Sequence, residues 1–347
     1  MVGTTNPRRG ATVRVGLITR GDRGGLAAQT YDFYKHVKPD KVMLVNIDVY
    51  THQTTDESKY PGAYIVRNYP TTVEWNEWLT DLDVVFTVEC PYDHELYRIA
   101  RERGIKTIEQ HNFEFQAFHQ SPEFPKPDLI LSPSSWRQDE VIWAPVKYLH
   151  VPVDREKFPF KGKIHAKTFI HIAGHRTFND RNGTVILLEA LPYIKSDIKI
   201  KLFTQDELPR PYTDSKLEII REDFPDNASL YKEGDVLILP RRYGGLSLQM
   251  NEALSCGMPV ISLDIAPQNE FLPEHWLIPA TLKEQTMVKT MIDVYDADPQ
   301  VLAAKIDEFA DSLIMVDSAI ADAISSEKSW TVMLPKYIQL MEELCLA

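Results

Sequence analysis

The residues best placed to do chemistry lie in the stretch 239–261, where a pair of glycines precedes a glutamate. Gly244-Gly245 allows the backbone to turn tightly and to approach a ligand. A helix that begins directly after such a loop presents free N–H groups and the positive end of its dipole, so the peptides of 245–248 could hold a phosphate. Glu252 lies about one and a half turns further on, roughly 7 Å along the helix axis. Its carboxylate could there accept hydrogen bonds from a ribose diol.

The elements that would position these residues follow from the pattern of apolar side chains. A short apolar run at 236–239 predicts a buried strand, and apolar residues between 246 and 254 recur at helical spacing. Gly257 is a C-cap candidate and Pro259 prevents the helix from continuing, so 260–263 is predicted to be the next strand. The alternative for the whole stretch is an ordinary strand-loop-helix unit with a surface glutamate.

This string resembles the donor-site signature of the family 4 glycosyltransferases, which have the GT-B fold. Their signature runs Pro-Ser, two residues, Glu-Gly-Phe-Gly-Leu, then Glu-Ala, a small residue, Gly, one residue and Pro-Val-Ile. Matching residues stand here at Pro240, Gly245, Leu248, Glu252, Ala253, Gly257, Pro259, Val260 and Ile261. In the family the second glutamate binds the nucleotide ribose, so the resemblance implies this role for Glu252.

Two positions depart from the signature. Gly244 occupies the place of the first glutamate of the pair, which in the family lies near the donor sugar and phosphate. Leu246 and Ser247 replace Phe-Gly. The resemblance thus implies that Gly244, Gly245, Leu246 and Ser247 border the donor, but it leaves the donor sugar and the stereochemical outcome open.

Two arginines form a second predicted contact with the donor. They lie in the loop between a predicted strand at 168–173 and the helix that follows. The family has Gly-Arg, a short loop and Lys-Gly here, and both basic residues clamp the donor diphosphate. By strict position His175 and Asn182 replace them, and Arg176 and Arg181 each stand one place away. Because an arginine fork suits a diphosphate, Arg176 and Arg181 are the predicted clamp.

The beginning of the chain has the pattern of a doubly wound sheet, in which a strand, a glycine-containing loop and a helix follow one another. The strand is predicted at 12–19 and the helix at 26–37, with Gly24 and Gly25 between them. The loop is not a dinucleotide fingerprint of the Gly-x-Gly-x-x-Gly type. In GT-B enzymes this loop faces the interdomain cleft, so Gly24 and Gly25 are predicted to let donor phosphate and acceptor approach the backbone. A plain tight turn is the alternative.

His111 is the catalytic candidate on the acceptor side. It lies just past a strand predicted at 105–109, and open α/β sheets bind ligands at the carboxyl ends of their strands. An imidazole can accept or give a proton near neutral pH. Many GT-B enzymes carry a histidine in this region, and the alternative is a structural, hydrogen-bonded histidine. Glu109 and Glu114 are weaker candidates, which could simply be surface carboxylates.

The composition is that of a soluble globular protein, with 44% hydrophobic and 25% charged residues. The net charge of -12 argues against a general polyanion binder. Three widely spaced cysteines predict neither a disulfide framework nor a metal cluster, and no metal site is expected. No apolar run approaches membrane-spanning length and no signal peptide is recognised, so we expect a cytoplasmic protein without a membrane span.

A chain of 347 residues is long enough for two domains. With the resemblance, the prediction is an α/β protein of two Rossmann-like domains facing a cleft, the GT-B fold. We expect an acceptor-side domain at 1–155 and a nucleotide-sugar donor domain at 156–325. A C-terminal helix within 326–347 should pack back on the first domain. Inside the donor domain, 287–295 is expected to be helical.

The predicted function is the transfer of a hexosyl or pentosyl unit from a nucleotide-sugar to an acceptor hydroxyl. The resemblance implies retention of configuration, no metal ion and no cofactor beyond the nucleotide-sugar co-substrate. Two other classes stay open: a nucleotide-sugar epimerase of the same fold, and a catalytically weak nucleotide-sugar binding protein that lacks the first glutamate. The acceptor would be a saccharide or small molecule or, given the arginines near the first glycine loop, a modified base in DNA.

Overall fold

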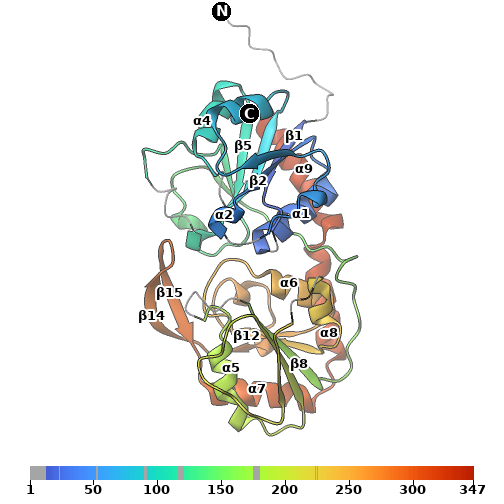
Figure 1. The fold of residues 1–347 in the computed structure, drawn as a ribbon. Helices are drawn as coiled ribbons and strands as arrows, with labels where there is room; N and C mark the ends of the chain where they lie inside the picture. The colour runs from blue at the N-terminus through green and yellow to red at the C-terminus, as the bar shows by residue number, and fades with distance from the viewer. Residues whose placement is uncertain are drawn as a thin grey trace, which may run out of the picture. The chain divides into compact units, whose positions relative to one another are not determined.

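The computed structural model describes residues 13–347 except 23, 52–53, 90–91, 116–120, 175–179, 223 and 225. It divides into two compact units. Unit 1 comprises the residues up to Val151 together with Thr331–Ala347, and unit 2 comprises Pro152–Trp330. Of the strands labelled in Figure 1, β1, β2 and β5 belong to unit 1, and β8, β12, β14 and β15 belong to unit 2.

In the described part of unit 1, seven parallel strands form one sheet in the order β3-β2-β1-β4-β5-β6-β7. They are β1 (Val15–Thr19), β2 (Lys41–Asn46), β3 (Tyr64–Arg67), β4 (Val84–Val88), β5 (Lys106–Gln110), β6 (Leu129–Ser132) and β7 (Val146–Tyr148). The central strands are almost continuously apolar, and every residue of β4 is buried. Such runs are typical of parallel strands that are covered on both faces.

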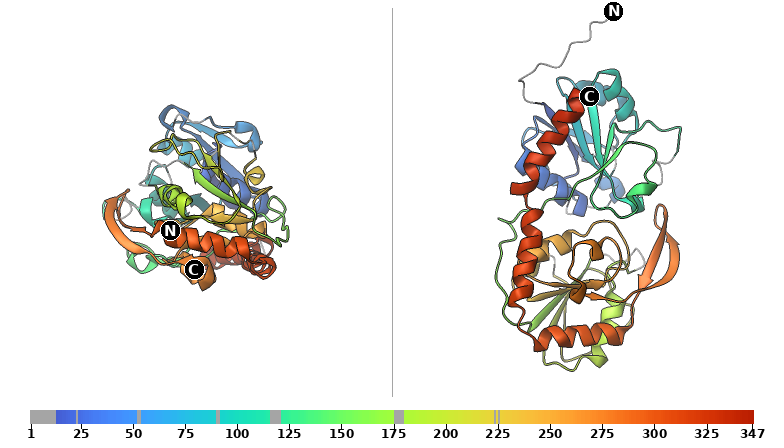
Figure 2. Two further views of the ribbon diagram at one scale, coloured as in Figure 1. Left: turned by 90° about the horizontal axis from the view of Figure 1, so that it is seen from below. Right: turned by 180° about the vertical axis from the view of Figure 1, so that it is seen from behind.

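Helices cover the sheet of unit 1. They are α1 (Gly25–Val37), α2 (Asp48–Thr51), α3 (Thr72–Trp78), α4 (Glu95–Glu102) and most of α9 (Trp330–Leu346), with the short helices η1 (Glu57–Lys59), η2 (Phe113–Phe115) and η3 (Gln138–Glu140). Tyr337 of α9 meets the rings of Phe33 and Phe86 edge-on, and its hydroxyl donates to the carbonyl of His150 at 3.2 Å. The predicted return of the C-terminal helix to the first domain is therefore confirmed (Figure 2).

In the described part of unit 2, six parallel strands form a second sheet in the order β10-β9-β8-β11-β12-β13. They are β8 (Thr168–Gly174), β9 (Lys199–Thr204), β10 (Leu217–Ile220), β11 (Val236–Ile238), β12 (Val260–Leu263) and β13 (Leu277–Ile278). The helices are α5 (Thr184–Ala190), α6 (Leu248–Ser255), α7 (Pro299–Asp311) and α8 (Met315–Glu327), with η4 (Leu191–Tyr193), η5 (Asn227–Tyr231), η6 (Gln268–Glu270) and η7 (Glu274–Trp276). Their apolar faces enclose one core, to which Leu187, Leu254 and Ile306 contribute fully buried side chains.

The expected helix at 287–295 is wrong. The chain instead forms an antiparallel hairpin of β14 (Thr281–Met287) and β15 (Met291–Asp296), which stands out from the rest of unit 2 in Figure 1. Ile292 and Val294 are buried while their neighbours are not, which is the alternation of a strand rather than the spacing of a helix. Side chains also pair across the hairpin, as Lys283 does with Asp296 at 2.8 Å.

The predicted α/β architecture with two parallel sheets is confirmed by these strand orders. Among the residues that the structure describes, no helix has both the length and the apolar character needed to cross a membrane.

Candidate active site

The glycine loop joins β11 to α6 in unit 2. Gly244 has a φ of 107°, which glycine adopts readily. A glutamate, which the family has at this position, would be strained in this backbone conformation. Ser247 caps α6, because its hydroxyl accepts a hydrogen bond from the N–H of Met250 at 3.3 Å. The N–H groups of residues 245–248 donate to no described residue, and they are therefore available to a ligand.

Glu252 lies on α6 and is buried, with 9% of its surface exposed. Its carboxylate accepts hydrogen bonds from the hydroxyl of Tyr231 at 2.6 Å and from the amide of Asn227 at 2.8 Å. Burial raises the pKa of Glu252, while these two hydrogen bonds and Lys157 act in the opposite direction. Because each carboxylate oxygen can accept more than one hydrogen bond, Glu252 can still bind a ligand hydroxyl. It is not a surface glutamate.

Arg181 is brought to the glycine loop by the start of α5. Gly183 begins this helix so close to β11 that a Cβ there would lie 2.2 Å from the carbonyl oxygen of Pro240. The guanidinium of Arg181 lies 5.6 Å from the ring centre of Tyr243 and donates to the carbonyl of Leu246 at 3.5 Å. The other predicted clamp residue, Arg176, lies outside the described residues.

Arg241 is a residue of this site that the sequence analysis missed. It is 5% exposed and donates to the side-chain oxygen of Asn182 at 3.1 Å and to the carbonyl of Leu246. The C=O and N–H of one peptide point in opposite directions. Since Arg241 donates to the carbonyl of Leu246, the N–H of Ser247 is directed away from the guanidinium. Arg241 therefore positions the loop.

Arg242 and His171 hold the neighbouring loops in the same way. The backbone N–H of Arg242 donates to the carbonyl of Arg181 at 2.9 Å, and its Nε donates to the carbonyl of Tyr295 in β15 at 2.8 Å. His171 joins the end of β11 to the start of α5. Its Nδ1 donates to the carbonyl of Ile238 at 2.8 Å, and its Nε2 accepts from the hydroxyl of Thr184 at 2.9 Å. Burial lowers the pKa of His171, which favours this neutral form.

The sequence offered one signal for these positioning residues. Arg241 and Arg242 follow Pro240 directly at the end of a predicted strand, where the family has a serine after the proline. Charged residues at the carboxyl end of a parallel strand lie where open sheets bind ligands. His171 gave no such signal, because a histidine within a strand is compatible with many roles.

The first glycine loop lies in unit 1, at the carboxyl end of β1. Gly24 is the N-cap of α1, which begins at Gly25. The carboxylate of Asp22 organises the loop, since it accepts a hydrogen bond from the N–H of Gly24 at 2.8 Å and pairs with Nε of Arg20 at 3.0 Å. Arg20 is thus committed to a partner within its own loop.

His111 also lies in unit 1, just past the end of β5, and is 3% exposed. Its Nδ1 is 3.8 Å from a carboxylate oxygen of Glu109, whose other oxygen accepts a hydrogen bond from Tyr97. Its ring meets that of Trp143 edge-on at 5.8 Å. Glu109 and Glu114 are both fully buried, so their interpretation as surface carboxylates is wrong. In the described residues no group of three or more His, Cys, Asp or Glu is arranged to hold a metal ion.

Residues 166–311 match the family model described as glycosyl transferases group 1. This segment contains the glycine loop, Arg181, Arg241 and Glu252, so the resemblance to group 1 glycosyltransferases is confirmed there, while the assignment to family 4 stays a prediction. No curated protein sequence matches the chain.

Solved structures match over nearly the whole length. The structure of HepE from Anabaena with UDP and glucose has a TM-score of 0.66 at 11% identity, and the match covers 95% of this chain and 100% of that chain. A sucrose-phosphate synthase from Thermosynechococcus elongatus has a TM-score of 0.63 at 13% identity, with coverages of 96% and 99%. A glycosyltransferase from Rickettsia africae has a TM-score of 0.63 at 12% identity, with coverages of 96% and 98%.

The chain has the GT-B fold. Unit 2 carries the glycine loop and Glu252, and unit 1 carries His111. At these identities the likeness establishes the fold, and the chemistry has to be argued from the residues themselves.

Proposed function

We propose that the protein is a glycosyltransferase that moves a hexosyl or pentosyl unit from a nucleotide-sugar to an acceptor hydroxyl. The observation that carries the proposal is the row of peptide N–H groups at 245–248, which donate to no described residue and precede the buried carboxylate of Glu252 on the same helix. A diphosphate suits the N–H groups, and a ribose diol suits the carboxylate. The family match of residues 166–311 supports the same ligand.

The chemistry would depend on positioning and on charge stabilisation. When the bond between the anomeric carbon and the diphosphate oxygen breaks, negative charge develops on the leaving diphosphate. The loop N–H groups and Arg181 would stabilise that charge, and Arg241 keeps the loop oriented before the reaction begins. The acceptor oxygen forms the new bond and loses its proton, for which His111 is the candidate acceptor. By resemblance we propose retention of configuration, with no metal ion and no cofactor other than the nucleotide-sugar.

The donor we propose is a UDP-sugar. HepE, which shares the fold, was crystallised with UDP and with UDP-glucose. UDP-glucose is therefore the first donor to test, ahead of GDP-, ADP- and TDP-sugars. Because glucose is a hexose, we propose hexosyl transfer ahead of pentosyl transfer.

The acceptor we propose is a hydroxyl of a saccharide or small molecule, in the cytoplasm. The net charge of -12 disfavours a polyanionic acceptor. Arg20, which could have contacted a phosphate, is paired with Asp22 at 3.0 Å instead. A modified base in DNA is thus less well supported than a neutral acceptor.

A screen of nucleotide-sugars by thermal unfolding tests the proposal. A ligand that binds only the folded protein, at about 100 times its Kd, stabilises it by about 2.7 kcal/mol, which raises Tm by about 5–10 °C for a unit of this size. We expect this shift with UDP-glucose in EDTA, and release of UDP on incubation. The absence of both a shift and release of the matching nucleoside diphosphate, with all four nucleotide classes, would refute the proposed function.

A further inference from the structure

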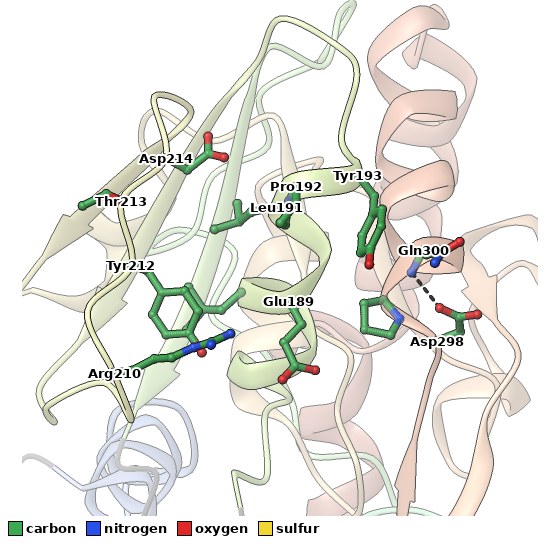
Figure 3. Close-up of a pocket in the computed structure, with 12 residues that line it drawn as sticks. Glu189, Leu191, Pro192, Tyr193, Arg210, Tyr212, Thr213, Asp214, Asp298 and Gln300 are labelled. Atoms are coloured by element: carbon green, nitrogen blue, oxygen red, sulfur yellow. Dashed lines mark hydrogen bonds between the residues drawn. The ribbon is translucent and has the colours of Figure 1, made fainter.

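A pocket with a volume of about 470 Å³ lies on the surface of unit 2. Its walls come from the end of α5 with η4, from the segment between β9 and β10, and from the start of α7 (Figure 3). Pockets that bind small molecules typically have about 300–1,000 Å³. The pocket is therefore large enough for a ligand.

The pocket lies at the edge of the sheet opposite to the glycine loop. Its residues 191–193 and 210–214 come shortly before the first residues of β9 and β10, whereas the glycine loop follows the last residue of β11. The amino ends of parallel strands meet at one edge, and their carboxyl ends meet at the other. A ligand in this pocket would consequently not compete with a nucleotide-sugar.

Hydrogen-bonding groups in the pocket are left to the solvent. The hydroxyl of Tyr193, the carboxylate of Glu189 and the side-chain amide of Gln300 make no hydrogen bond to a described residue. The carboxylate of Glu189 accepts hydrogen bonds, whereas the hydroxyl of Tyr193 and the amide of Gln300 can both donate and accept them. This mixture suits a ligand that carries several hydroxyl groups.

The pocket also offers flat aromatic surfaces. Tyr193 is 48% exposed, and the guanidinium of Arg210 lies 5.0 Å from the ring centre of Tyr212. Figure 3 shows Tyr212 and Arg210 together on one side of the end of α5 and Tyr193 on the other. The negative face of an aromatic ring attracts positively polarised C–H groups, which a sugar ring presents on its flatter face.

The charge of the lining excludes one class of ligand. Glu189, Asp214 and Asp298 contribute carboxylates, and Arg210 is the only cationic side chain among the lining residues. Asp214 accepts from the N–H of Lys216, and Asp298 accepts from the N–H of Gln300, each at 2.8 Å. The excess of negative charge disfavours phosphates and nucleotides. Neutral and cationic ligands remain, and the exposed hydroxyl and amide groups favour a neutral one with several hydroxyl groups.

We propose that this pocket binds a neutral saccharide, which stacks on Tyr193 and forms hydrogen bonds with Glu189, Arg210 and Gln300. The proposal goes beyond glycosyl transfer, because it concerns a separate binding site that operates without the donor. Such a site would keep a glycan on the protein while the nucleotide is exchanged.

Calorimetric titration of the full chain with maltohexaose, cellohexaose and chitohexaose tests this proposal. We expect at least one of the three to bind. Tyr193→Ala and Arg210→Ala should each weaken binding about tenfold, since an aromatic contact or a hydrogen bond to a charged group is worth about 1–2 kcal/mol. Tyr193→Phe keeps the ring and should retain most of the affinity.

Two controls separate this site from the donor site. Tyr69→Ala removes a tyrosine of similar exposure in unit 1 and should leave saccharide binding unchanged. Glu252→Ala should weaken UDP-glucose binding and leave saccharide binding intact. The proposal is overturned if none of the three oligosaccharides binds, or if binding survives both Tyr193→Ala and Arg210→Ala. Neither result would affect the proposed transfer reaction, which is measured by UDP release.

Discussion

Both units place polar side chains at the carboxyl edge of a parallel sheet, but the two sets differ, since arginines gather beside the glycine loop of unit 2 and acidic side chains are buried around the end of β5 in unit 1. In unit 2 the loops bring together Arg181, Arg241 and Arg242. In unit 1 the corresponding edge holds the buried carboxylates of Glu109 and Glu114 beside His111.

Under the proposed function, this difference would suit the two units to two kinds of ligand. Guanidinium groups and free N–H groups suit a diphosphate, whereas carboxylates and an imidazole accept hydrogen bonds from a hydroxyl. We therefore expect the two units to contribute differently, with unit 2 binding the donor and unit 1 acting on the acceptor. Changes in unit 2 should alter donor affinity, and changes in unit 1 should alter the rate while donor affinity is kept.

The largest effect is expected from Arg241→Ala. The substitution releases the carbonyl of Leu246 and the side chain of Asn182, so the glycine loop loses its orientation. We expect kcat/KM for UDP release from UDP-glucose to fall by about 100-fold or more. In Arg241→Lys, which keeps the charge but not the forked guanidinium, kcat/KM should fall about tenfold. Arg98→Ala, which removes an exposed arginine of unit 1, is the matched control. Full activity in Arg241→Ala would contradict the positioning role.

Arg241 also illustrates what the sequence could and could not predict. The register of the glycine pair, the helix and Glu252 is local, so spacing along the chain was enough to place them. The contacts of Arg241 join loops that are far apart in sequence, such as its bond to Asn182. No pattern of neighbouring residues reports such contacts.

Two predictions from the sequence were wrong, the exposure of Glu109 and the helix at 287–295, and both depend on contacts with other elements. Glu109 is buried because Tyr97, from a separate helix, supplies a hydrogen bond that the sequence of β5 does not reveal. The stretch 287–295 is short, and its apolar residues fit helical spacing as well as strand alternation over so few positions. Its pairing with β14 decides the outcome.

His111→Asn in unit 1 tests whether this unit alters the rate without altering donor affinity. A positioned proton acceptor contributes about 100-fold or more to a rate, so UDP release from UDP-glucose, with water as the acceptor, should slow by about that factor. The Kd of UDP-glucose, measured by calorimetry, should stay within about twofold of the wild type, since His111 is assigned to the acceptor side. Equal loss of donor affinity and rate would show that the two units are not divided in this way.

A pH effect on stability is expected from His171. Burial holds its pKa below the ordinary value of about 6.5, and the neutral ring accepts a hydrogen bond from Thr184. The stability that depends on this neutral ring is present above about pH 6.5 and is lost as the pH falls towards the lowered pKa. Its contribution to the free energy of unfolding should decline by up to about 1.4 kcal/mol per pH unit. Urea unfolding between pH 7.5 and 5 measures this slope, and His171→Gln should flatten it. An unchanged slope would exclude His171 as the cause.

The smallest effect is expected from Ser247→Ala. Loss of the N-cap of α6 should lower the free energy of unfolding by about 1 kcal/mol, measured by urea unfolding. Ser247→Thr keeps the hydroxyl and serves as the control. UDP-glucose affinity should fall only a few-fold in Ser247→Ala, because the loop N–H groups remain in place.

Under the proposed function, unit 2 holds the nucleotide through Glu252. A matched pair of buried carboxylates tests it, with Glu252→Gln in unit 2 and Glu109→Gln in unit 1. Calorimetric titration with UDP should give a Kd at least about tenfold weaker for Glu252→Gln, since a hydrogen bond to a charged group is worth about 1.5–3 kcal/mol. The Kd for Glu109→Gln should equal that of the wild type. Unchanged UDP affinity in Glu252→Gln, or an equal loss in both variants, would contradict the assignment.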